Sequence, residues 1–234
     1  MKKFILKFLT LIFCFAIIMS FTGCGSEAKK AMDTSVETAN TLLEKNDKPF
    51  NPDTKIALKK AVKDSENAEN DDEYKKKTKD INDTMTAYKD SIKQQKQVIK
   101  PAEEFLIERA KTVKTVKTVQ AATEENDPNG QLNKKGGYYS YIAMKSTMIN
   151  DSYYESQSPI EAGNDGGAVI EAYRTVKEAK TRDEYLTTFD GSGMLSPGSH
   201  KIVGTLVIRT SSELTASQQK ELEQNIINAL IELK

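Results

Sequence analysis

Apolar side chains recur at helical spacing from residue 26 to residue 97, without the alternation that is typical of a strand. Ser26 can cap a first helix, which should end before Asn46-Asp47-Lys48-Pro49. Pro52 begins a second segment, and Asn70-Asp71-Asp72 can cap a third. The third segment carries the most regular series of inward positions: Tyr74, Thr78, Ile81, Met85, Tyr88, Ile92, Gln95 and Ile99. This pattern predicts an antiparallel three-helix bundle, or spacer, over residues 24–99.

Residues 100–123 are predicted to form a helical linker. Lys100-Pro101 followed by two glutamates is typical of a helix start, because proline is favoured at the first helical position and acidic side chains interact well with the helix dipole. The triplet Lys-Thr-Val then occurs three times between Lys111 and Val119. A period of three fits neither helix nor strand well. We therefore expect a helix to about Thr112, a kink, and a short helix to Ala122.

Residues 124–234 are predicted to form a small α+β domain. A strand opens at Gly136-Gly137, where the following side chains alternate between two faces up to Met144. Polar and turn-forming residues over 150–167 predict a long loop. The other predicted elements are a strand over 168–174, a helix over 176–189, a strand over 200–209 and a helix capped by Thr215. The order β-β-α-β-α predicts two helices packed on a three-stranded, largely antiparallel sheet.

The N-terminal segment has the pattern of a signal peptide. Met1-Lys2-Lys3 is followed by an uncharged apolar run from Phe8 to about Phe21, roughly 14 residues, whereas a helix needs about 20 to cross a membrane. The run ends in Phe21-Thr22-Gly23-Cys24, which resembles the lipobox of bacterial lipoproteins, with Phe21 at the place usually held by leucine. The resemblance implies cleavage after residue 23, a diacylglycerol and palmitate anchor on Cys24, and a place at the extracytoplasmic face of the cell membrane. A retained signal anchor is the alternative.

Composition limits the partners and the chemistry. The chain has 34 basic and 34 acidic residues, and cleavage after residue 23 would remove three lysines, leaving a net charge of about −3. A basic surface for nucleic acid is therefore not expected. Cys14 would leave with the signal segment, so Cys24 could form no internal disulfide. His200 is the only histidine, which argues against a histidine-rich zinc site and against a Ser-His-Asp triad.

One loop offers a candidate calcium site. Glu125, Asp127, Asn129 and Gly130 occupy places one, three, five and six of a loop similar to an EF-hand. Gly136 stands at place twelve, where such a loop needs a bidentate glutamate. The competing interpretation, a simple turn around Pro128 without metal, is the one that the residues favour.

A second group of residues could hold a small anion or the end of a peptide. Asp165, Gly166 and Gly167 precede the strand over 168–174, Arg182 and Asp183 lie on the predicted helix, and His200 begins the last strand. Glycines in such a loop permit a close approach of the backbone. The structural alternative is that Asp165 caps a turn, Arg182 pairs with an acid and His200 is solvated. The helix over 176–189 is expected to bury these residues: Val176, Ala179, Tyr185, Leu186 and Phe189.

Two resemblances concern whole segments. Residues 28–95 are similar to the FIVAR-type three-helix modules of Gram-positive surface proteins, through 39–43 (Ala-Asn-Thr-Leu-Leu), the turn 48–52 and 57–61 (Ala-Leu-Lys-Lys-Ala). In that family the modules act as spacers or bind glycans and matrix proteins. Residues 124–232 resemble an uncharacterised C-terminal domain of Gram-positive lipoproteins. The residues that carry this second resemblance are 127–130 (Asp-Pro-Asn-Gly), 164–167 (Asn-Asp-Gly-Gly), 180–186 (Lys-Thr-Arg-Asp-Glu-Tyr-Leu), 198–200 (Gly-Ser-His) and 214–219 (Leu-Thr-Ala-Ser-Gln-Gln).

These features favour a non-enzymatic lipoprotein that binds a cell-wall polymer or an envelope protein and needs no cofactor. Two alternatives stay open. A solute-binding or transport-accessory lipoprotein would place its site in the loop over 150–167. An envelope hydrolase would have to use Asp127 with Asp165, although no nucleophile or metal cluster accompanies these carboxylates in the sequence.

Overall fold

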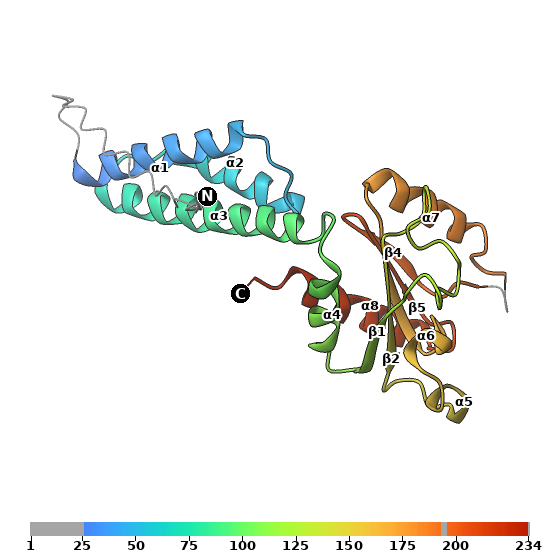
Figure 1. The fold of residues 1–234 in the computed structure, drawn as a ribbon. Coiled ribbons are helices and arrows are strands. Elements are labelled where there is room, and N and C mark those ends of the chain that lie inside the picture. The colour runs from blue at the N-terminus through green and yellow to red at the C-terminus, as the bar shows by residue number, and fades with distance from the viewer. Residues whose placement is uncertain (1–25, 193–195, 234) are drawn as a thin grey trace, which may run out of the picture.

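A computed structural model describes residues 26–192 and 196–233 of the protein (Figure 1). In this part of the chain a helical bundle is followed by an α+β domain, as the sequence predicts. The predicted signal segment over 1–23 and Cys24 lie outside the described residues. None of the helices within the described ranges combines the length and the hydropathy that a membrane crossing requires.

The bundle consists of α1 (Glu27–Glu44), α2 (Pro52–Ser65) and α3 (Asp71–Gln97). Each helix has a side-chain N-cap, from Ser26, Asn51 and Asn70, which satisfies a backbone N–H that the helix itself leaves without a partner. The buried side chains come from all three helices: Met32, Ala39, Leu58, Ile81, Met85, Tyr88 and Ile92. The spacing of apolar positions in the sequence therefore identified most of the core of the bundle, but it was wrong for Ile99, which lies beyond the end of α3 and is exposed.

The linker is only partly helical. Helix α4 (Glu103–Lys111) begins and ends close to the predicted positions, but β1 (Val116–Ala121) replaces the short helix that was predicted to reach Ala122. β1 pairs antiparallel with β2 (Ser140–Ser146) and contains an irregularity between Val116 and Thr118. The β-branched side chains of the triplet repeat fit a strand better than a helix, and pairing with β2 decides between the two.

The sheet has five strands in the order β1-β2-β3-β5-β4, and every neighbouring pair is antiparallel. β3 is Gly167–Ala172, β4 is His200–Val203 and β5 is Leu206–Thr210. The prediction of three strands was wrong for two reasons. β1 was assigned to a helix, and the segment over 200–209 was interpreted as one strand although it is a hairpin.

A two-residue turn at Gly204-Thr205 divides this hairpin, with Val203 opposite Leu206 and Ile202 opposite Val207. Gly204 has a φ of 64°, in the left-handed region that glycine adopts without strain. Residues paired across a ladder share a face, so Val203 lies on the same face as Leu206. A single continuous strand would have placed them on opposite faces.

Helices cover both faces of the sheet (Figure 1). α4 and α8 (Ala216–Ile231) pack with a large apolar cluster on one face, whereas α7 (Val176–Thr187) packs on the other with Tyr141, Val169 and Val207. The predicted loop over 150–167 contains two single-turn helices, α5 (Ser152–Glu155) and α6 (Pro159–Ala162).

Hydrogen bonds join the bundle to the α+β domain at the end of α3. The N–H of Thr205 donates to the carbonyl oxygen of Val98 at 2.9 Å, and the N–H of Lys100 donates to Thr205 Oγ1 at 2.8 Å. The side-chain amide of Gln97 donates to the carbonyl oxygens of Leu230 and Glu232 at 3.1 and 3.0 Å. The hairpin turn and the end of α8 therefore hold the end of the bundle.

Candidate functional site

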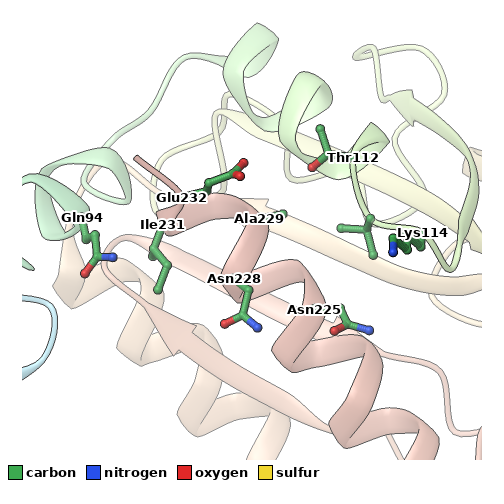
Figure 2. A pocket seen from close by; sticks show the side chains of 9 residues that line it. Gln94, Thr112, Lys114, Asn225, Asn228, Ala229, Ile231 and Glu232 are labelled. Carbon is green, nitrogen blue, oxygen red and sulfur yellow. The ribbon is translucent and has the colours of Figure 1, made fainter. Parts of the chain in front are cut away.

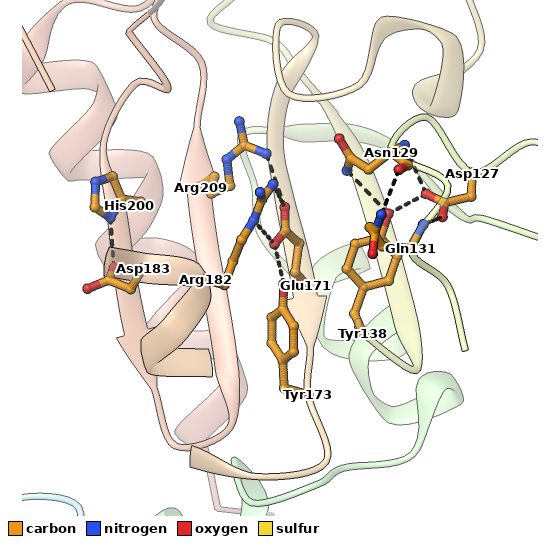
Figure 3. A network of polar contacts seen from close by, with 10 residues as sticks. All are labelled: Asp127, Asn129, Gln131, Tyr138, Glu171, Tyr173, Arg182, Asp183, His200 and Arg209. Atoms are coloured by element: carbon orange, nitrogen blue, oxygen red, sulfur yellow. Dashed lines mark hydrogen bonds and ion pairs between the residues drawn. The ribbon is translucent and has the colours of Figure 1, made fainter. Parts of the chain in front are cut away.

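A buried ion cluster lies between the sheet and α7 (Figure 3). Glu171 on β3 has a fully buried side chain, and its carboxylate accepts hydrogen bonds from Arg182 Nε and Nη2 at 2.7 and 2.8 Å. Arg209 Nη1 on β5 donates at 3.0 Å, and the hydroxyl of Tyr173 donates at 2.8 Å. Two guanidinium groups thus surround one carboxylate, leaving one excess positive charge beneath α7.

Burial by itself would raise the pKa of Glu171, but the hydrogen bonds and charge of Arg182, with help from Arg209 and Tyr173, outweigh it and hold this pKa below its ordinary value. Burial, and then the charge of the same carboxylate, raise the pKa of Tyr173. The cluster is therefore an ionised carboxylate held by two cations and a neutral phenol.

Asp127 organises the loop that precedes β2. Its carboxylate accepts hydrogen bonds from the backbone N–H groups of Asn129 at 3.1 Å and Leu132 at 2.7 Å, from that of Gln131, and from the hydroxyl of Tyr138. Burial opposes ionisation, but these donors together hold the pKa of Asp127 below its ordinary value. Among the described residues, no three acidic, histidine or cysteine side chains form a group that could hold a metal. The oxygens of the candidate calcium ligand Asp127 are occupied by the turn.

The structure brings together two of the six candidate residues for an anion or peptide end, Asp183 and His200. His200 Nδ1 lies 2.7 Å from Asp183 Oδ1, and Nε2 lies 3.2 Å from Asp190 Oδ1. The imidazole is only 9% exposed. Arg182, the neighbour of Asp183, turns instead to Glu171 (Figure 3).

Asp165, Gly166 and Gly167 have backbone roles at the start of β3. The carbonyl oxygen of Asp165 accepts a hydrogen bond from Ser211 Oγ at 3.0 Å, and that of Gly166 accepts one from the N–H of Ser146 at 2.9 Å. A Cβ on Gly167 would lie 2.7 Å from the Ser146 nitrogen. These glycines allow neighbouring strands to approach, and among the described residues no hydrogen bond or ion pair joins 165–167 to Arg182, Asp183 or His200.

An open cleft of about 430 Å³ lies beside the ion cluster, between α7 and the loop over 129–137. Tyr173 and Arg182 from the cluster line it together with Tyr185. The Tyr185 side chain is 55% exposed, and Val176 is also exposed, so the prediction that both are buried was wrong. Ala179 and Leu186 are buried as predicted, and Tyr185 lies about 120° around the helix from Ala179.

A second cleft, of about 630 Å³, lies where α3, α4 and α8 approach one another (Figure 2). Its walls carry the amide side chains of Gln94, Asn225 and Asn228, with Lys114 at one side and Glu232 at the other. This cleft therefore lies at the junction between the two halves of the chain, and its walls combine polar and apolar side chains with one basic and one acidic residue.

Comparison with protein-family models, with curated proteins and with solved structures finds no match at the level of significance applied. The functional interpretation therefore depends on the chain's own residues. Sequence reasoning missed three members of the ion cluster, Glu171, Tyr173 and Arg209. One signal was present, because Glu171 interrupts the apolar run Ala168-Val169-Ile170, and a charge within a buried strand requires a partner.

Acid should destabilise the α+β domain before it affects the bundle. The pKa values of Glu171 and Asp127 are lower in the folded chain than their ordinary values of 4.5 and 3.8. Their contributions to stability are therefore complete above those ordinary values and are lost as the pH falls through the lowered folded values. Urea denaturation at a series of pH values from about 6 down to about 3 should show a falling free energy of unfolding. Asp127→Asn should make the free energy of unfolding depend less on pH. An unchanged pH dependence would contradict the role given to Asp127.

Proposed function

We propose that the protein is a lipid-anchored, non-enzymatic binding or adaptor protein at the extracytoplasmic face of the cell membrane. Cys24 would carry the diacylglycerol and palmitate, α1 to α3 would act as a spacer, and the α+β domain would engage a cell-wall polymer or an envelope protein. Two or three acyl chains on one cysteine would make the attachment stable, because a single chain holds a protein only marginally.

The position of α1 carries this proposal. The helix begins at Glu27, three residues after Cys24, at the end of the bundle remote from the α+β domain (Figure 1). α3 has 27 residues, about 40 Å at 1.5 Å per residue, and its far end is hydrogen-bonded to the domain. An anchor at Cys24 would thus be separated from the α+β domain by the length of the bundle.

The geometry favours this role over the two alternatives. A solute site in the loop over 150–167 would have a cavity of only about 170 Å³, below the roughly 300 Å³ of small-ligand pockets. Lys145 Nζ, which lines this cavity, already donates to the carbonyl oxygens of Glu155 and Gln157. A paired-carboxylate hydrolase would use Asp127, whose oxygens accept hydrogen bonds within its own turn.

Metabolic labelling tests the anchor. Cells grown with a clickable palmitate analogue should give a labelled band for the unchanged protein and none for Cys24→Ser, because lipid attachment requires this thiol. The variant should also move from the membrane fraction to the soluble fraction. Cys14→Ser is the matched control and should keep its label. An unlabelled wild-type protein, or unchanged fractionation of Cys24→Ser, would contradict the proposal.

A further inference from the structure

The cleft of about 430 Å³ beside α7 has features that are typical of a binding site and that the packing of the ion cluster does not explain. Tyr185 is more than half exposed, although it is a large aromatic residue on a helix whose other face is buried. Its ring is positioned by two contacts, an edge contact with Phe189 at 5.2 Å and the guanidinium of Arg182 at 5.5 Å. An exposed aromatic ring held in place offers contact area at little cost in conformational entropy.

Polar side chains, both neutral and charged, line the same cleft as this ring. Asn129 and Gln131 bring exposed amides from the loop, and Thr181 brings an exposed hydroxyl from α7. Glu178 and Arg182 add one negative and one positive charge. Amides and hydroxyls both donate and accept hydrogen bonds, so the cleft can satisfy a ligand that presents many groups of the same type.

Arg182 makes a free anion a poor fit. Its Nε and Nη2 donate to Glu171, so the bidentate fork that would bind a carboxylate or phosphate is already used within the protein. Glu178 on the same wall would also repel an anion. The exposed part of the guanidinium can still donate to a neutral oxygen.

We propose that this cleft binds a chain of hexopyranose rings. A sugar ring has polarised C–H bonds on one face, which suit the negative face of a tyrosine ring, and hydroxyls at its edge, which suit Asn129, Gln131 and Thr181. An open cleft of about 430 Å³ accommodates a section of a continuing polymer. The inference rests on the proposed function in that it names the class of polymer that the adaptor holds.

Titration calorimetry of the full-length protein tests the site, in a detergent without a sugar headgroup. Two probes are used, the tetrasaccharide of β-linked N-acetylglucosamine and maltotetraose, and inorganic phosphate is the comparison ligand. We expect saturable binding of at least one tetrasaccharide and none of phosphate. Tyr185→Ala should weaken the sugar about tenfold, the usual effect of losing an aromatic contact.

Tyr153→Ala is the matched control, because Tyr153 is 66% exposed, lies in the same domain and also makes an edge contact with an aromatic neighbour, yet does not line the cleft. It should leave the affinity unchanged. Binding of neither sugar, sugar binding that Tyr185→Ala does not weaken, or heat from phosphate alone would overturn the proposal. Palmitate labelling does not depend on this cleft, so loss of sugar binding with an intact lipid anchor would remove the ligand assignment alone.

Discussion

Glu171→Ala is expected to lower the free energy of unfolding of the α+β domain by about 3–5 kcal/mol, the range measured when one partner of a buried ion pair is removed. Glu171 is fully buried and binds the guanidinium groups of Arg182 and Arg209. Its removal would leave two buried cations facing each other without an anion and would deprive the Tyr173 hydroxyl of its acceptor. The measurement is urea denaturation followed by circular dichroism.

Glu184→Ala is the matched control for this variant. Glu184 is an exposed glutamate on α7, so its removal should change stability by no more than about 0.5 kcal/mol. Equal effects of the two substitutions would show that the cluster contributes little. The bundle should keep its own transition in both variants, since its apolar core contains no residue of the cluster.

Gly204→Ala is expected to cost about 3 kcal/mol, the sum of left-handed backbone strain and overpacking. Gly204 has a φ of 64°, and an added Cβ would lie 2.2 Å from the carbonyl oxygen of Val98. That oxygen accepts the hydrogen bond from Thr205, so the turn would have to move away from the end of the bundle. Urea denaturation gives the loss of stability, and limited proteolysis near residues 98–101 should become faster.

Gly191→Ala separates the two causes. Gly191 also has a positive φ, 73°, but a Cβ there would have no atom of the described residues within 4 Å. Gly191→Ala should therefore lower the free energy of unfolding only by the cost of the left-handed backbone, about 1–2 kcal/mol. It should leave the rate of proteolysis at residues 98–101 unchanged. A Gly204→Ala variant no less stable than Gly191→Ala would mean that the contact with Val98 is easily relieved.

The bundle and the general α+β organisation could be predicted because their signals are local. Met85 and Ile92 follow the helical period, and the capping residues precede each helix. β1 could not be predicted in this way, since a repeat of three residues has no preferred face and its state depends on pairing with β2. The hairpin could not be recognised because the period of two between apolar and other residues continues through Gly204, as it would in a single strand.

The candidate site was harder to predict because its residues come together only after folding. Glu171, Arg182 and Arg209 lie on three different elements, and nothing in their spacing links them. Sequence reasoning did single out Arg182 and suggested an acid as one partner, without naming Glu171. The pattern places Tyr185 in the core because aromatic residues on helices are usually buried. In the structure Arg182 of α7 faces the sheet instead, where it pairs with Glu171.

The place of α8 at the end of the chain also determines when the α+β domain can fold during synthesis, because α8 supplies part of the core of that domain. The bundle is complete once α3 has emerged, because its core residues all precede residue 97. The hydrogen bond from Gln97 to Leu230 spans 133 positions, so the other half cannot close until the last helix has been synthesised. A chain stalled before α8 would therefore have a folded bundle followed by a sheet that α8 does not yet cover. Chaperones or proteases would act on the chain in this state.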